Sequence, residues 1–373
     1  MERSKDARSR SNRRNGNAGS RAGRSGDATI LDVAALAGVS IATVSRVVNG
    51  FPRILPRTRK RVEEAIADLA YRPNVHARRL VTQSVDTICF LLSNREFLNP
   101  FHAGVLTGIE QVAARLKLEV LYTTYRYAPD TPSDRLDLPP ILGRTGAIGG
   151  LVLAGTNYPN LLRAVGQRGI PHVLFGNNLV LGGRAARRTD VVYFDDEQGA
   201  TDVVEYLLRL GHRRVAFAGD ITQPWWQRRC SAYRRVMRRH HLPQLEYIRP
   251  LEQALPYGAE AARYFLKRAH PPTAIFAGND LIAAGIWREF RSRQISVPGD
   301  ISLVGFDDLQ VATLMDPALT TVQAPVEAVG QECMRMIVEK MTHPETLLPQ
   351  RMLPTKMIVR ESCAPPGGGD NSR

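Results

Sequence analysis

Short apolar segments alternate with amphipathic segments along most of the chain that follows residue 84. Runs rich in apolar and β-branched residues predict strands, here residues 87–92, 120–125, 150–154, 172–175, 191–194, 215–218, 274–277 and 302–306. Apolar positions spaced three and four apart predict helices, here residues 101–116, 200–210, 229–239, 259–269, 281–292 and 325–341. This alternation predicts an α/β fold with doubly wound parallel sheets, and so many strands favour two similar lobes.

A different pattern precedes this region and predicts three short helices. Thr29 and Asp32 have the spacing of a capping box, which favours a helix start. Gly38 can end this helix because glycine tolerates positive φ, Ser40 can cap a second helix, and a third follows Pro56. The residues expected on the buried faces of the first and third helices are Val33, Leu36, Ala37, Val62, Ala65, Ile66 and Leu69. Two helices joined by a glycine-containing turn, with a third packed across them, form a helix-turn-helix domain.

The second of these helices has the composition of a DNA-recognition helix. Ile41, Ala42 and Arg46 lie on the face opposite its valines, where the N-terminal end of the helix can reach base edges in the major groove. Arg46 can donate two hydrogen bonds to guanine, and the two apolar residues can contact thymine methyl groups. The short polar residues that can bind backbone phosphates are Thr29, Ser40, Thr43, Ser45 and Asn49. The alternative is a plain three-helix bundle with a solvated Arg46.

Charge is distributed unevenly, which indicates an anionic partner for the N-terminal part of the chain. The whole chain carries a net charge of +14 at pH 7, yet residues 1–80 hold 17 lysines and arginines against 7 acidic residues. Residues 1–27 contain almost no apolar side chains, so they are predicted to be a disordered basic tail. This tail is either a solubilising extension or an arm that adds phosphate contacts.

Composition and motifs argue against several classes of protein. Four cysteines without CxxC spacing do not indicate a disulfide scaffold or a zinc module, and no metal or cofactor is expected. Because no run of 18 apolar residues and no apolar leader is found, we expect a cytoplasmic, nucleoid-associated protein without a membrane partner. Since GxSxG, HExxH, P-loop and GxGxxG patterns are absent, no enzyme is expected. The acidic trio at residues 195–197 is interpreted as a capping loop.

The N-terminal domain resembles the DNA-binding signature of the lac-repressor (LacI/GalR) family. The segments that carry the resemblance are residues 29–50, 58–62 and 71–80. Pro73 stops the preceding helix and Asn74 can cap a short new one, which the resemblance identifies as a hinge helix that orders on operator DNA. The resemblance implies that Leu80 wedges into the minor groove and that Ala77 allows close approach of the paired hinge. From the sequence alone, Leu80 could equally be a linker residue packed on the next domain.

The α/β region resembles the periplasmic-binding-protein-like regulatory domain of the same family. The segments that carry this resemblance are residues 99–101, 211–215, 278–280, 298–308 and 319–322. It implies a sugar or related metabolite as effector, held between the lobes by Phe101, Arg229, Asn279 and Asp307. The three polar groups suit hydroxyls or an anion, and the aromatic ring offers a stacking surface. Each polar residue also has a structural alternative: a helix-start arginine, a helix cap and a turn cap, respectively.

The chain departs from the family pattern at two places. Leu55 precedes the third helix where the family usually has Ser or Thr, so a helix cap is lost. Ala232 stands where the family usually has the glycine that follows the pocket arginine. Its neighbours Cys230, Trp225, Trp226 and Tyr233 therefore predict an atypical pocket edge. Trp225, Trp226 and Tyr257 could each stack on a sugar ring or belong to the core.

These patterns together predict a ligand-responsive transcriptional repressor that binds a pseudo-palindromic operator as a homodimer. The alternatives are a solute-binding protein of the same fold without a regulatory role, and a non-specific nucleoid-like DNA binder. The predicted parts are a disordered tail (1–27), the helix-turn-helix domain (28–71), the hinge and linker (72–84), the effector-binding and dimerisation domain (85–362) and a disordered tail (363–373). The N-lobe is expected at about 85–193 plus 325–344, and the C-lobe at about 194–324 plus 345–362. The segment after Met341 lacks a leucine heptad, which argues against an appended tetramerisation helix.

Overall fold

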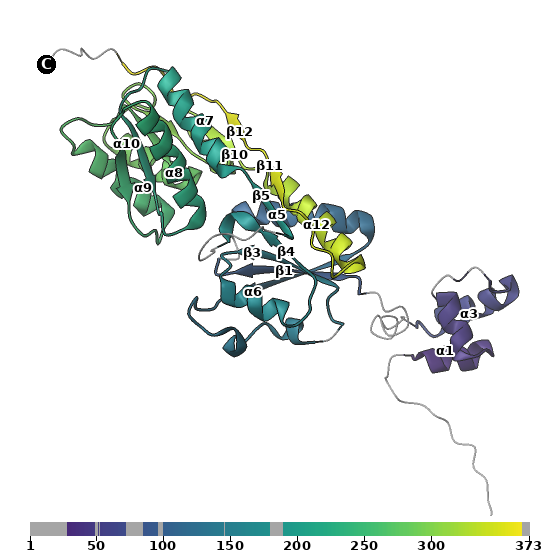
Figure 1. The fold of residues 1–373 in the computed structure, drawn as a ribbon. Helices are drawn as coiled ribbons and strands as arrows, with labels where there is room; N and C mark the ends of the chain where they lie inside the picture. The colour runs from purple at the N-terminus through teal and green to yellow at the C-terminus, as the bar shows by residue number, and fades with distance from the viewer. Residues whose placement is uncertain are drawn as a thin grey trace, which may run out of the picture. The chain divides into compact units, whose positions relative to one another are not determined.

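The chain divides into two compact units, Met1–Gln83 and Ser84–Arg373. The computed structural model describes residues 28–48, 51, 53–71, 85–95, 100–144, 146–179 and 189–367. The first unit, called the head below, is helical, and the second unit, called the body, is α/β (Figure 1). The predicted tail at 1–27 and the predicted hinge at 72–84 lie outside the described residues.

Three helices build the head: α1 (Ile30–Ala37), α2 (Ile41–Val48) and α3 (Pro56–Asp68). The bend between α1 and α2 is 104°, which is the geometry of a helix-turn-helix. Gly38 makes this turn in the left-handed region, at φ 61°. Thr29 caps α1 and forms the predicted capping box with Asp32.

The core of the head draws residues from all three helices, and one prediction about it is wrong. The buried residues are Val33, Ala34, Ala37, Val44, Val47, Val62, Ala65 and Tyr71. Leu36 is 54% exposed, and Ala34 is buried in its place because the buried face of α1 is rotated from the predicted one. Arg61 of α3 donates to the carbonyl oxygens of Ala37 (2.6 Å) and Gly38 (3.1 Å), so it satisfies acceptors at the end of α1. As predicted, Leu55 provides no side-chain cap for α3.

The N-terminal lobe of the body is a six-stranded parallel sheet with the strand order β11-β5-β4-β3-β1-β2. The strands are β1 (Thr87–Ser93), β2 (Glu119–Tyr125), β3 (Gly150–Gly155), β4 (His172–Phe175), β5 (Val191–Phe194) and β11 (Arg351–Leu353). Helices α5 (Pro100–Leu116) and α12 (Val326–Thr342) cover one face, and α6 (Pro159–Gly166) covers the other (Figure 1).

The C-terminal lobe is a four-stranded parallel sheet with the strand order β7-β6-β8-β9. Its strands are β6 (Val215–Gly219), β7 (Leu245–Ile248), β8 (Ala274–Ala277) and β9 (Ser302–Val304). The helices are α7 (Asp196–Arg209) and α8 (Pro224–Arg239) on one face, and α9 (Ala254–Leu266) and α10 (Asp280–Ser292) on the other. The short helix α11 (Gln310–Leu314) follows β9, and β10 (Thr321–Gln323) pairs antiparallel with β12 (Lys356–Ile358).

The C-terminal segment of the body departs from the prediction at two places. Strand β11 pairs in parallel with β5, so residues 351–353 extend the sheet of the N-lobe, although 345–362 was expected in the C-lobe. Residues 363–367 were expected to be disordered, but the Ala364 backbone exchanges hydrogen bonds with Ser302 and His212. These contacts attach the segment to Ser302 of β9 and to His212, which precedes β6. They also satisfy the backbone groups of Ala364.

No single helix among the described residues is long and apolar enough to cross a membrane.

Candidate functional site

Helix α2 presents the predicted recognition residues on its exposed side. Ile41, Ala42 and Arg46 are exposed, whereas Val44 and Val47 are buried in the core of the head. The buried valines therefore fix which face of α2 is available to a partner.

The phosphate-binding candidates of the head lie around the start of α1 and α2. Ser40 accepts a hydrogen bond from the Thr43 backbone N–H (3.2 Å), and the two hydroxyls lie 2.9 Å apart. Thr29 is exposed and Ser45 is half-buried. Asn49 and the predicted hinge residues Asn74, Ala77 and Leu80 lie outside the described residues.

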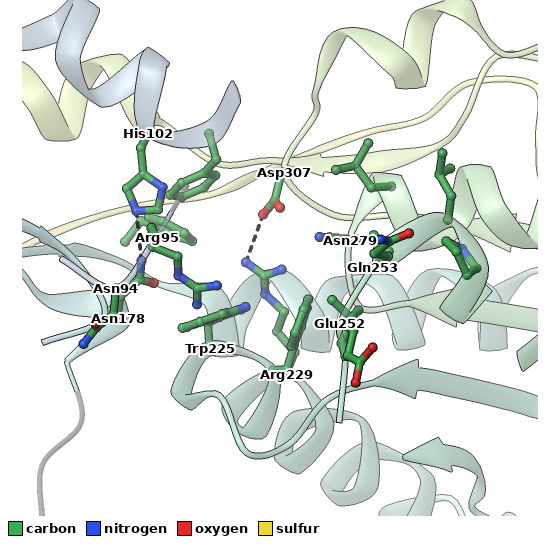
Figure 2. Close-up of a pocket in the computed structure, with 18 of the residues that line it drawn as sticks. Asn94, Arg95, His102, Asn178, Trp225, Arg229, Glu252, Gln253, Asn279 and Asp307 are labelled. Atoms are coloured by element: carbon green, nitrogen blue, oxygen red, sulfur yellow. Dashed lines mark hydrogen bonds and ion pairs between the residues drawn. The ribbon is translucent and has the colours of Figure 1, made fainter. Parts of the chain in front are cut away.

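A pocket of about 640 Å³ in the body brings together all four predicted effector residues. Phe101 lies in the first turn of α5, Arg229 in α8, Asn279 at the start of α10 and Asp307 after β9. The two lobes both contribute, because α5 belongs to the N-lobe and the other three belong to the C-lobe. Figure 2 shows Arg229 and Asp307 directed toward each other at the centre of this group.

Arg229 and Asp307 form an ion pair inside the pocket. Arg229 is only 2% exposed, and it donates to Asp307 Oδ1 (3.0 Å) and to the Gly278 carbonyl oxygen (2.6 Å). Its guanidinium lies 3.6 Å from the ring centroid of Phe306. The alternative of an ordinary helix-start arginine does not account for these contacts, which hold the guanidinium in a fixed orientation.

Asp307 occupies an unusual electrostatic and backbone environment. Burial raises its pKa to about 6, while Arg229 acts in the opposite direction by stabilising the carboxylate. Its φ is 104°, in the left-handed region that favours glycine. Backbone strain of this kind persists where the surrounding structure holds it, and it often occurs at binding sites.

Asn279 is a helix cap and also lines the pocket. Its Oδ1 accepts a hydrogen bond from the Ile282 N–H (2.9 Å), so it is the N-cap of α10. It also lines the pocket, because the start of α10 faces into it (Figure 2). Phe101 packs with its ring centroid 5.9 Å from Phe175 and 6.0 Å from Phe194 and closes the N-lobe side.

Only some of the residues that predicted an atypical pocket edge line the pocket. Trp225 and Trp226 line the pocket. Ala232 and Tyr233 are completely buried and Tyr257 is 5% exposed, and none of these three contributes to the pocket lining. The departure from glycine at residue 232 therefore changes the core of the lobe rather than the pocket, because its position on α8 points into the sheet.

Several pocket residues escaped the sequence analysis. They are Asn94, Arg95, His102, Arg126, Asn178 and residues 251–256. Asn94, Arg95 and Arg126 follow β1 and β2 directly, and 251–256 follow β7. Because ligands of such folds bind beyond the carboxyl ends of parallel strands, the polar residues after the predicted strands 87–92 and 120–125 were the available signal. No such signal was available for residues 251–256, because β7 was not predicted.

The acidic trio has the structural role that was predicted for it. Asp195 accepts a hydrogen bond from the Gln198 N–H (2.9 Å) and caps α7. Asp196 is buried and forms an ion pair with Arg228 (2.8 Å). No group of three or more metal-ligating side chains occurs in the described part of the chain.

A helix-turn-helix head and a two-lobed α/β body with a pocket, carried on one chain, form the architecture of a DNA-binding regulatory protein. Residues 29–74 match the model for bacterial regulatory proteins of the lacI family, and residues 204–363 match a periplasmic binding protein-like domain. The chain belongs to the LacI family and is a DNA-binding transcriptional regulator rather than an enzyme or a plain solute-binding protein.

Known relatives match nearly the full length of this chain. Catabolite control protein A of Priestia megaterium is 31% identical over 90% of this chain and 98% of its own length. The transcriptional regulator CelR of Thermobifida fusca is 33% identical over the same shares. A solved CelR–cellobiose complex covers 90% of this chain and 99% of its own, with 29% identity and a TM-score of 0.65. The lac repressor dimer bound to operator and the anti-inducer ONPF covers 91% and 100%, with 23% identity and a TM-score of 0.78, and so supports the fold.

Proposed function

We propose that this regulator is a repressor whose operator affinity is changed by a small molecule bound in the body pocket. The observation that carries the proposal is the convergence of Phe101, Arg229, Asn279 and Asp307 on one pocket lined by both lobes. A ligand that contacts both lobes stabilises one relative arrangement of them, and it thereby shifts the population of operator-binding molecules. The pairing of such a pocket with an exposed recognition helix supports this coupling.

The DNA-binding roles follow from side-chain chemistry and exposure. Arg46 donates to a guanine edge, and Ile41 and Ala42 contact apolar base groups. The residues proposed to bind phosphates and fix the register are Thr29, Ser40, Thr43, Ser45 and Asn49. In the hinge, Asn74 caps a short helix, Ala77 permits close pairing and Leu80 wedges between base steps.

The operator is proposed to be pseudo-palindromic and the regulator a homodimer. A two-fold axis that relates two heads requires two inverted half-sites. The lac repressor dimer solved on its operator supports this arrangement by its similar fold. Because its partner is the chromosome, we place the protein in the cytoplasm with the nucleoid.

The proposed effector is a sugar or a related metabolite. The solved complex of CelR with cellobiose supports this class, since CelR is similar to this chain over nearly its whole length. Asp307 and Asn279 accept and donate hydrogen bonds to hydroxyls, Arg229 donates from a fixed fork, and Phe101 covers an apolar ring face.

The test begins with selection of bound sequences from random DNA by the full chain, followed by binding measurements on the selected site with a panel of sugars and sugar derivatives. We expect an inverted repeat and at least one compound that changes operator affinity. Asp307→Ala should bind the selected site as tightly as the wild type and lose the response. A response that survives in Asp307→Ala would show that the pocket residues are assigned incorrectly, and selection without enrichment would contradict specific DNA binding.

A further inference from the structure

The pocket contains more cationic side chains than its buried carboxylate can neutralise. Arg95, Arg126 and Arg229 line it, against Glu252 and Asp307. The Arg229 charge is matched by Asp307 at 3.0 Å. Arg126 and Glu252 are both exposed, so solvent screens their charges. The charge that remains inside the pocket is that of Arg95.

Arg95 is held in place, yet it has no carboxylate partner among the residues that the structure describes. Its guanidinium lies 4.3 Å from the ring centroid of Trp225, and its Nη2 donates to Gln223 Oε1 (3.3 Å). Its Nε is buried without a hydrogen-bond partner. Among the described residues no carboxylate comes within ion-pair distance of Arg95, and the oxygens of nearby Asp220 already accept from Thr222 and Leu251.

An unpaired guanidinium in this position is costly without a ligand. Burial lowers the pKa of Arg95 to about 10, and the nearby Tyr158 and Asp220 offset this only in part. A buried polar donor without an acceptor destabilises the folded protein, and more strongly when it is charged. A group held in this way is typical of a binding site that is complete only when its ligand is present.

We propose that the effector is an anionic sugar, whose carboxylate or phosphate binds Arg95 while its hydroxyls bind Asn279 and Asp307. This inference rests on the effector-binding function proposed above. Figure 2 shows Arg95 and Arg229 both directed into the pocket, with Trp225 beside Arg95. The planar guanidinium accommodates two oxygens of a carboxylate or phosphate in parallel hydrogen bonds.

The position of Arg95 also connects the anion to lobe closure. Arg95 follows β1 of the N-lobe, whereas Trp225 and Gln223, which contact it, lie at the start of α8 in the C-lobe. The Arg95 guanidinium already bridges the lobes. An anion bound to it therefore neutralises its charge and lowers the free-energy cost of keeping it buried. Neutral sugars cannot do this, although they can satisfy Asn279 and Asp307 equally well.

The test compares matched probes on the full-length protein by thermal shift and calorimetry. Each set contains a neutral hexose, its uronic acid and its 6-phosphate, for both glucose and galactose. We expect stabilisation by the uronic acid or the phosphate of one set and weaker or no stabilisation by its neutral member. Comparison of the uronic acid with the 6-phosphate shows whether the pocket prefers a carboxylate or a phosphate.

Variants of Arg95 test whether this residue binds the anionic group of the effector. Arg95→Gln should weaken binding of the stabilising acid about 10- to 100-fold, and Arg95→Lys should restore part of it. Arg288→Gln, an exposed arginine of α10 outside the pocket, should leave binding unchanged. Preference for the neutral hexose, or an acid that binds Arg95→Gln at wild-type affinity, would overturn the anion assignment while effector regulation stands. No stabilisation by any probe, together with no effect of the wider sugar panel on operator affinity, would instead overturn the effector function itself.

Discussion

The specificity proposed for the head and for the pocket depends on single side chains. On the head, Arg46 is the one exposed residue of α2 that combines charge with a planar donor fork. In the pocket, Arg229 and Asp307 hold one another, so each is positioned before a ligand arrives. In the pocket, neighbouring residues fix the direction of the functional groups, whereas on the head the buried valines fix which face of α2 carries Arg46.

Arg46→Ala is expected to lower affinity for the selected operator by about 1–3 kcal/mol while affinity for unrelated DNA at low salt changes little. The reason is that a lost base contact removes discrimination, whereas a lost phosphate contact weakens binding to every sequence. Fluorescence anisotropy on both DNAs measures the two effects. Arg53→Ala, an exposed arginine of the head outside α2, serves as the control. Equal losses on the two DNAs would contradict the recognition role of Arg46.

Asp307 is expected to make stability depend on pH. Its pKa in the folded protein, about 6, lies above the ordinary value of 3.8, so the folded state binds the proton more tightly. The stabilisation is complete below about pH 4 and is lost as the pH rises through about 6, on the order of 3 kcal/mol. Urea unfolding of wild type and Asp307→Asn at several pH values measures the difference. Parallel stability profiles for the two proteins would refute this assignment.

At the scale of helices and strands, caps and turns decide where elements begin and end. Helices α7, α8 and α9 each start several residues before their predicted positions. The apolar pattern marks only the buried part of a helix. The first turn of α7 is stabilised by Asp195 as N-cap, and α8 begins with Pro224 at its first helical positions. Strands β7 and β10 were not predicted, because their three or four residues include polar side chains and do not form the apolar run that marked the equally short β5 and β8.

Gly38→Ala is expected to destabilise the head by about 1 kcal/mol. The added methyl group has room, since its nearest neighbour, Arg61 Nη2, lies at an ordinary contact distance of 3.5 Å, but φ of 61° strains any residue with a β-carbon. Operator affinity and calorimetric unfolding of the head measure the loss. Gly166→Ala is the control, because this glycine ends α6 without positive φ and without close neighbours, and it should be neutral or slightly stabilising. A neutral Gly38→Ala would contradict the requirement for glycine at the turn.

At the scale of the whole molecule, contacts between the two lobes of the body hold the two sides of the pocket together. The chain passes between lobes at the ends of β5, β10 and β11. Arg228 of α8 reinforces the first passage, because it donates to Asp196 Oδ1 (2.8 Å) and to the Asn177 carbonyl oxygen of the N-lobe (2.6 Å). The lobes are therefore joined by polar contacts close to the pocket, where a ligand can influence them.

Arg228→Met is expected to lower the stability of the body by about 3 kcal/mol, since it leaves the buried Asp196 carboxylate without its cation. All three tryptophans lie in the body, so tryptophan fluorescence during urea unfolding reports on it. Arg235→Met on the same helix is the control, because the Arg235–Glu197 pair is exposed and should contribute less than about 1 kcal/mol. Similar losses in the two variants would show that Arg228 does not have this role.

The sequence by itself determined the helix-turn-helix, the α/β class of the body and eight of its strands, and through a resemblance it identified four residues that line the pocket. These features rest on local rules, such as the capping box at Thr29, positive φ at Gly38 and apolar periodicity, or on a resemblance carried by contiguous segments. Only the tertiary structure decided that Arg95 lies over Trp225, that Arg228 joins the lobes, that Leu36 is exposed and that β11 belongs to the N-lobe sheet. Each of these depends on residues far apart in the chain, and their packing partners are not encoded in any local pattern.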